Sequence, residues 1–273
     1  KASLAEPASR RRGNWDFRAW LAQFRMLRRW TCCIGGARNS GRPSLCAAAP
    51  EGAAALRKEK PPVMISIDGN IGSGKSTLLG MLKDRGFEPA TPKPTSVHFA
   101  PERTHEWKGM LERYYEDTKR WAFSFQMQVL LSHIRNHREA RALGTDLCFV
   151  ERSPLAARWV FGEILKRDGT LTEVEAALFD DYMELAWCPD AIVLLDCSPE
   201  TCLERVAKRS RTGEAGIPLE YLRSVSQAYE EFVQGYARDK GIPVVRVNTE
   251  RGEIASIYQD VAGEIQELLK ILL

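Results

Sequence analysis

The chain has 273 residues and a formal net charge of +3, but the charge is unevenly distributed. Residues 1–60 hold 13 Lys and Arg against 4 Asp and Glu, which leaves a net charge of −6 on the remaining 213 residues. The acidic charge of residues 61–273 argues against nucleic acid as the main partner, because binding its phosphates requires a basic surface. No apolar run approaches the ~18 residues that are needed to span a membrane.

Residues 1–60 are predicted to be a basic N-terminal extension, separate from a domain at residues 61–273. Between Trp15 and Trp30 apolar residues recur at helical spacing, with arginines largely elsewhere on the wheel. This Arg-rich, acid-poor composition is typical of an organelle transit peptide, and a disordered or non-native segment is the alternative. The scattered cysteines favour a reducing compartment, so a cytoplasmic location is expected, or a mitochondrial one if the extension is a transit peptide.

A phosphate-binding loop follows the first predicted strand, at residues 63–68, and precedes a helical pattern at 77–85. The spacing GxxxxGK[ST] lets glycines turn backbone N–H groups toward phosphate oxygens, beside the positive end of a helix. Lys75 is expected to reach the β- and γ-phosphates of ATP, and the Ser76 hydroxyl to bind Mg²⁺. The predicted ATP-binding residues of this loop are Gly69, Asn70, Ile71, Gly72, Ser73, Gly74, Lys75, Ser76 and Thr77.

Further strands are predicted at residues 87–91, 146–150, 191–196 and 244–247, alternating with long helical patterns. This order predicts an α/β fold of the P-loop NTPase type: three layers, with a parallel five-stranded sheet flanked by helices. Ligands of such sheets gather beyond the carboxyl ends of the strands. The loop at 69–76, the segment 88–94 and residues 151–153 should therefore surround one cleft.

Two clusters in this cleft suggest chemistry. Glu151 and Arg152 directly follow a strand, and offer a carboxylate for Mg²⁺ or proton transfer beside a guanidinium for phosphoryl charge; a strand-end ion pair is the alternative. The helix at 117–141 carries Trp121, Phe125 and Gln126, whose amide suits a nucleobase edge, although an aromatic stripe is more often core.

A third cluster, at residues 205–222, is a helix end rich in arginine that runs into a loop containing glycine. Such a segment can close over ATP as a lid, exclude water and bring arginines to the transferring phosphoryl group. A solvated basic face is the alternative interpretation.

Together these motifs resemble the deoxynucleoside kinase family, from about residue 63 to the C-terminus. The resemblance is carried by IDGNIGSGKS at 67–76, RWAFSFQ at 120–126, ERS at 151–153, SPETCLER at 198–205 and GIPLEYL at 216–222. It implies ATP-dependent, Mg²⁺-assisted phosphorylation of the 5′-hydroxyl of a deoxynucleoside. It also implies a homodimer formed through the long helices at 117–142 and 154–167.

The resemblance implies roles for single residues as well. Gln126 would hold the base with Phe161 stacked on it, and Tyr115 with Glu214 would hold the sugar 3′-hydroxyl. The catalytic residues would be Lys75, Glu151 and Arg152, with Ser76 and Glu151 at the metal. The full expected sets are Arg205, Arg209 and Arg211 for the lid, and Tyr115, Phe125, Gln126, Val129, His133, Arg152, Ala157, Phe161 and Glu214 for the substrate.

Two positions are expected to depart from the family pattern. In the family a Glu-Pro pair after the second strand takes the 5′-hydroxyl proton, and the aligned residues here read Lys93-Pro94. An ammonium cannot accept a proton, so catalysis should be weakened, Glu151 should serve as base, and Lys93→Glu should raise kcat. His98 aligns where the family commonly has a tryptophan near the base. A binding-only pseudokinase and a nucleoside monophosphate kinase are the alternative functions.

The base preference is predicted from two further aligned positions. Members that accept cytosine and purines carry an Arg and an Asp there, whereas thymidine-accepting members carry apolar residues. This chain has His133 and Ala157, with Val129 beside them. The missing acid and the small alanine favour a pyrimidine pocket that accepts thymidine.

Overall fold

The computed structural model describes residues 60–90, 95–209, 216–250 and 254–272, all within one compact unit, Leu56–Leu273. The predicted amphipathic helix between Trp15 and Trp30 lies outside the described residues. So do Lys93, Arg211 and Glu214. No helix in the described ranges combines the length and apolar character needed to cross a membrane.

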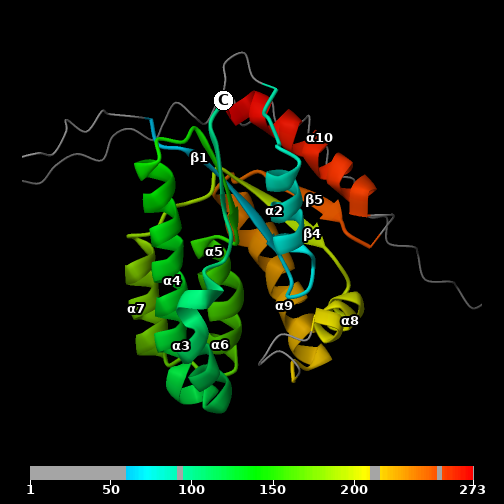
Figure 1. The fold of residues 1–273 in the computed structure, drawn as a ribbon. Helices are drawn as coiled ribbons and strands as arrows, with labels where there is room; N and C mark the ends of the chain where they lie inside the picture. The colour runs from blue at the N-terminus through cyan, green and yellow to red at the C-terminus, as the bar shows by residue number, and fades with distance from the viewer. Residues whose placement is uncertain (1–59, 91–94, 210–215, 251–253, 273) are drawn as a thin grey trace, which may run out of the picture. The chain divides into compact units, whose positions relative to one another are not determined.

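Five parallel strands form one sheet in the order β2-β3-β1-β4-β5, which confirms the predicted α/β fold (Figure 1). Because a parallel sheet needs helices on both faces, its central strands are buried and almost entirely apolar. The strands are β1 (Val63–Gly69), β2 (Val97–Ala100), β3 (Leu147–Glu151), β4 (Ala191–Asp196) and β5 (Val244–Asn248).

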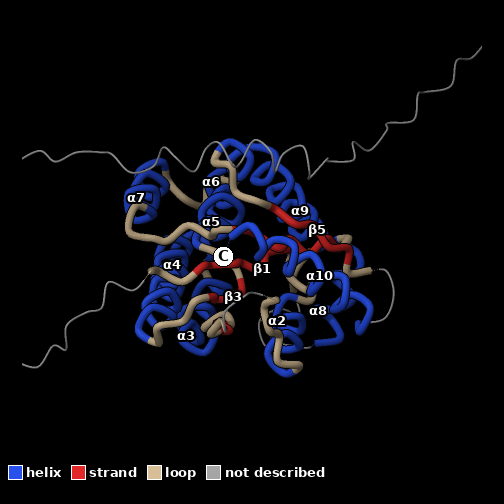
Figure 2. The backbone as a smooth tube through the Cα atoms, turned by 90° about the horizontal axis from the view of Figure 1, so that it is seen from above, coloured by secondary structure: helices blue, strands red, loops and turns tan. Residues whose placement is uncertain are grey.

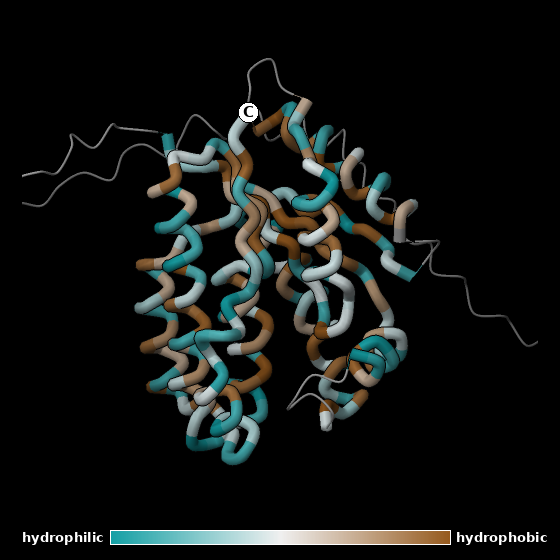
Figure 3. Tube along the Cα trace, in the orientation of Figure 1, coloured by the Kyte–Doolittle hydropathy of each residue, from teal (hydrophilic) through white to brown (hydrophobic). Residues whose placement is uncertain are grey.

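Helices cover both faces of the sheet (Figure 2), and alternate residues of the strands supply one core on each face. On one face, Ile65 and Ile67 of β1 pack with α2 (Lys75–Asp84) and α10 (Ile254–Leu272). On the other, Ile192 and Leu194 of β4 pack with the helices that follow β3 and with α9 (Leu219–Phe232), which η2 (Val233–Ala237) continues. The apolar stretches of Figure 3 accordingly run through the middle of the layers.

A group of helices next to the sheet encloses a third apolar region around Trp107, Phe125 and Phe179. The run that follows β3 is π-helical in its middle, a feature often found at functional sites. The members of the group are α3 (Thr104–Glu116), α4 (Thr118–Ala142), α5 (Pro154–Ala156), η1 (Ala157–Gly162), α6 (Glu163–Arg167) and α7 (Glu173–Met183).

The helix that carries the basic cluster, α8 (Pro199–Arg209), follows β4 directly. Its start is capped, because the Ser198 hydroxyl accepts a hydrogen bond from the Thr201 amide (3.2 Å) and proline occupies the first helical position.

The second strand is β2, at Val97–Ala100, and the prediction of a strand at 87–91 was wrong. Residues 87–90 are irregular, although Phe87 is buried edge-on against Phe149 (5.4 Å between ring centroids). The register pairs Ala100 with Val150 of β3, and Val150 with Ser66 of β1. The chain that leaves β2 therefore emerges at the same edge of the sheet as the phosphate loop and Glu151.

Candidate active site

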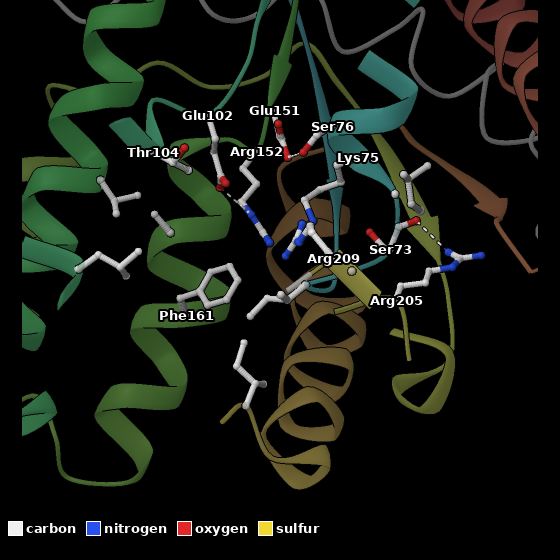
Figure 4. Close-up of a pocket in the computed structure, with 18 of the residues that line it drawn as sticks. Ser73, Lys75, Ser76, Glu102, Thr104, Glu151, Arg152, Phe161, Arg205 and Arg209 are labelled. Atoms are coloured by element: carbon white, nitrogen blue, oxygen red, sulfur yellow. Dashed lines mark hydrogen bonds and ion pairs between the residues drawn. The ribbon is translucent and has the colours of Figure 1, made fainter. Parts of the chain in front are cut away.

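A cavity of about 1030 Å³ opens at the carboxyl ends of β1 and β3, between the phosphate loop, α3, α4 and η1 (Figure 4). Its volume reaches the upper end of the ~300–1,000 Å³ typical of small-molecule sites. It therefore has room for more than one small ligand.

The phosphate loop has the backbone geometry that its glycines permit. Gly72 has φ +83°, and a Cβ there would lie 2.5 Å from the Cys202 carbonyl oxygen, so no other residue fits. Ser73 lies in the loop with a buried hydroxyl that has no hydrogen-bond partner among the described residues. A loop of this kind, at the positive end of α2, suits an anionic phosphate.

Gly69 and Asn70 support the loop from behind rather than lining the cavity. The Asn70 amide nitrogen donates to the Leu222 carbonyl (2.8 Å) and to the Ser226 hydroxyl (2.7 Å) of α9. The carbonyls of Gly69 and Asn70 accept hydrogen bonds from Lys75 Nζ, at 3.2 and 2.7 Å. These two predicted ATP-binding residues thus fix the loop and its lysine.

Lys75 lies almost wholly buried at the floor of the cavity. Burial, together with the nearby Arg152 guanidinium, lowers the pKa of its ammonium to about 7, against the opposing effect of Glu151. A phosphate group beside Lys75 would favour the charged form, so the lysine is arranged to gain from an anionic ligand.

Ser76 and Glu151 meet where α2 begins and β3 ends. The Ser76 hydroxyl donates to Glu151 Oε1 at 2.7 Å (Figure 4). A hydroxyl and a carboxylate are hard oxygen donors, and Mg²⁺ is commonly bound by one or two such groups together with substrate phosphates. The residues present therefore fit the expected magnesium ion.

Arg152 is held firmly in the middle of the site. It is the one described non-glycine residue with positive φ (+63°), a strained conformation that is often found at functional sites. Its Nη1 donates to the Gly69 carbonyl (3.0 Å) and to the Tyr229 hydroxyl (2.8 Å), and its guanidinium lies 4.7 Å from the centroid of the Phe161 ring. These contacts leave the guanidinium a single orientation.

The carboxylate after the second strand is Glu102, two residues beyond β2. Its Oε1 pairs with Arg152 Nε at 2.8 Å, and it lines the cavity (Figure 4). The alignment of Lys93 with this position was wrong, because the true second strand begins after residue 93. The expectation of impaired catalysis therefore loses its basis.

Trp107, and not His98, lies at the position where the family commonly has a tryptophan near the base. Its buried ring packs edge-on against Phe125, with centroids 5.9 Å apart, and lines the cavity. His98 lies within β2 and is not among the residues that line the cavity, so that alignment was also wrong. A short apolar run followed by Pro-Glu, with tryptophan five residues later, is the sequence signal that was missed.

The expected substrate residues come together from α3, α4 and η1. Those that line the cavity are Tyr115, Phe125, Gln126, Val129, His133, Ala157 and Phe161. Trp121, on the same helix as Gln126, is not among them, and its ring lies beneath the guanidinium groups of Arg113 and Arg120 instead.

His133 is 2% exposed, and neither ring nitrogen has a hydrogen-bond partner in the described part of the chain. Burial, with a smaller effect of Arg152, lowers the pKa of the imidazole to about 3. The ring is therefore neutral at physiological pH and carries one donor and one acceptor.

Arg205 and Arg209 reach the cavity from α8. Arg205 Nη2 donates to the Thr249 carbonyl at 2.7 Å, and Nη1 to the Ser73 carbonyl at 3.5 Å. Lys75, Arg152 and Arg209 approach the same space from three different elements (Figure 4). Positive charge thus surrounds the place where phosphates are expected.

Comparison with known proteins agrees with this geometry. Residues 65–270 match the family model described as deoxynucleoside kinase. Human mitochondrial thymidine kinase 2 is 30% identical over 252 residues, which cover 86% of this chain and 89% of that protein. Deoxycytidine kinase 1 of Xenopus laevis is 32% identical over 244 residues, 76% of this chain and 91% of that protein. A probable deoxycytidine kinase of fowlpox virus is 26% identical over 220 residues, with 75% and 88% covered.

Proposed function

The chain belongs to the deoxynucleoside kinase family, and on that basis we propose that it transfers the terminal phosphoryl group of ATP to the 5′-hydroxyl of a pyrimidine deoxynucleoside. The observation that carries the proposal is a single cavity that joins the phosphate loop to the buried Gln126 and His133. A triphosphate and a nucleoside can meet there without leaving the protein.

The phosphates of ATP bind the amides of the loop and Lys75, and Arg209 approaches them from α8. Ser76 and Glu151 would hold Mg²⁺, which would offset the negative charge of the phosphates. Because these groups are fixed before ATP arrives, little reorganisation opposes the transfer.

Glu102 accepts the proton of the 5′-hydroxyl. It combines a partly exposed carboxylate with a fixed partner, since Arg152 Nε binds one of its oxygens at 2.8 Å and orients the other. Arg152 also lies beside the phosphate loop through its bond to the Gly69 carbonyl. The same guanidinium can therefore stabilise charge on the oxygen that attacks and on the phosphoryl group that moves.

The nucleoside lies along α4, with its base against Gln126 and Phe161 and its sugar toward Tyr115. Gln126 has one acceptor and two donors, so its amide can turn to match either cytosine or thymine. The neutral His133 supplies a donor and an acceptor without bringing charge to the base. Ala157 is small enough to leave room for the thymine methyl group.

Initial-rate competition between thymidine, deoxycytidine and deoxyguanosine tests this preference. Both pyrimidines should show a kcat/KM at least about 10-fold above that of deoxyguanosine. Ala157→Asp places a carboxylate at a buried position and should lower the kcat/KM for thymidine more than the kcat/KM for deoxycytidine. A preference of the unmodified protein for deoxyguanosine would overturn the proposed substrate class.

We further propose a homodimer formed through α4 and α7, which pack against each other. The second helix is α7 and not the predicted helix at 154–167, because residues 154–167 are largely buried within the chain. Val174, Leu178 and Tyr182 recur every four residues on α7 and are at least 40% exposed, and Leu131 of α4 is equally exposed. Such a stripe is typical of a protein interface. Leu178→Glu should lower the sedimentation coefficient to that of a monomer. Leu143→Glu, at the residue that follows the end of α4 and about 18 Å from Leu131 along the helix axis, is the matched control and should leave the dimer intact.

A further inference from the structure

The turn that carries Glu102 is clamped on both sides by one buried side chain of α4. Asn136 is 3% exposed, and its Nδ2 donates to the carbonyl of Pro101, the residue before Glu102, at 3.3 Å. Its Oδ1 accepts a hydrogen bond from the Nε of Arg103, the residue after Glu102, at 2.5 Å. The two neighbours of Glu102 are thus tied to the same amide.

Arg103 is itself fixed by two carboxylates. Its Nη1 pairs with Glu106 Oε1 at 2.9 Å, and its Nη2 pairs with Glu139 of α4. The Arg103 and Glu106 side chains are only 22% and 18% exposed, which protects the pair from solvent screening. Arg103 therefore links the start of α3 to α4 with a defined geometry.

A purely structural network would explain the contacts between α3 and α4, but those helices already pack through Trp107 and Phe125. It would not explain why the amide bonds both neighbours of Glu102. The Glu102 carboxylate points the other way, to Arg152. The clamp therefore restrains the backbone of Glu102 and leaves its carboxylate to the cavity.

We infer that Asn136 and Arg103 are positioning residues, which touch no substrate and hold the Glu102 carboxylate at the distance from the 5′-hydroxyl that proton transfer needs. This inference rests on the proposed role of Glu102. Gln126 lies 10 residues before Asn136 on the same helix, or about 15 Å along its axis. One rigid helix thereby sets both the place of the nucleobase and the place of the proton acceptor.

The test uses the full chain with Asn136→Ala and Arg103→Ala, and follows kcat, the KM for the deoxynucleoside and the urea midpoint. Each variant should lose about 10–100-fold in kcat, because a 1 Å misplacement can cost that much, while the KM stays within about 3-fold. Arg135→Ala is the matched control. It removes a partner of Glu106 (2.6 Å) without touching the clamp, and should keep kcat.

Glu102→Gln separates the two levels of the inference. Adding Asn136→Ala to that variant should change kcat less than about 3-fold, since no carboxylate is left to position. A further 10–100-fold loss of kcat in the double variant would mean that Asn136 has a general structural role, and would overturn the inference. Wild-type kcat in both Asn136→Ala and Arg103→Ala would overturn it as well. If Glu102→Gln itself keeps the wild-type kcat, the proposed role of Glu102 fails instead. Should Asn136→Ala not fold, Arg103→Ala decides.

Discussion

Replacing Asp68 by asparagine tests how the buried charges behind the phosphate loop determine stability. Asp68 ends in a fully buried carboxylate, whose Oδ1 has no partner among the described residues and whose Oδ2 accepts a long hydrogen bond from the Ser153 hydroxyl (3.5 Å). Burial raises the pKa of this carboxyl from 3.8 to about 7, although Arg152 and Lys75 oppose the change.

The direction of the pH dependence of stability follows from which state, folded or unfolded, binds the proton. The folded pKa lies above the unfolded one, so between about pH 4 and pH 7 the folded state holds a proton that the unfolded state has lost. The free energy of unfolding therefore falls as the pH rises through this window. A difference of about 3 pKa units corresponds to about 4 kcal/mol in full, of which about 2 kcal/mol falls between pH 5 and pH 7.

Urea unfolding of both proteins at pH 5, 6 and 7 measures this term. Asparagine has no proton to lose, so Asp68→Asn should gain about 2 kcal/mol relative to the wild type between pH 5 and pH 7. Asp84→Asn, at an exposed position at the end of α2, is the control and should show no such trend. A difference between Asp68→Asn and wild type that does not vary with pH would refute the reasoning.

Three further predictions concern the site itself. Gly72→Ala brings a Cβ to 2.5 Å from the Cys202 carbonyl oxygen and should strain the loop by about 1–3 kcal/mol. Titration calorimetry should show that this variant binds ATP at least about 10-fold more weakly. Glu102→Gln should lower kcat by about 10²–10⁴-fold in single-turnover assays while the thermal midpoint stays near wild type. Lys75→Met should abolish detectable transfer yet leave the circular dichroism spectrum unchanged, because the charge it removes is buried and serves the phosphates. Wild-type rates in either of these variants would count against the assigned roles.

The sequence predicted the elements whose local signals are strong. The phosphate loop was evident because strand, glycines and helix follow one another without interruption, and the buried strands β3 and β4 read as continuous apolar runs. The substrate residues of α4 also lie on one side of the helix, as the spacing of Gln126, Val129 and His133 implies. The roles of these residues were predicted from the resemblance to the deoxynucleoside kinase family.

The second strand was misplaced for a physical reason. β2 has four residues, pairs with β3 along one edge only and is largely half-exposed, so its apolar pattern is weak. Phe87 packs into the core without belonging to a strand, and its apolar signal drew the prediction ten residues too early. That one error hid Glu102 and Trp107 and made Lys93 look like a lost catalytic base.

Phosphate transfer from Mg²⁺-ATP to thymidine or deoxycytidine, with the product identified by phosphorus NMR, tests most directly whether the protein is a deoxynucleoside kinase. A 5′-monophosphate should form in step with ADP, and its formation should disappear in Lys75→Met. Binding of ATP with no phosphate passed to any nucleoside, or transfer only to nucleoside monophosphates, would contradict the assignment of this cavity to a nucleoside kinase.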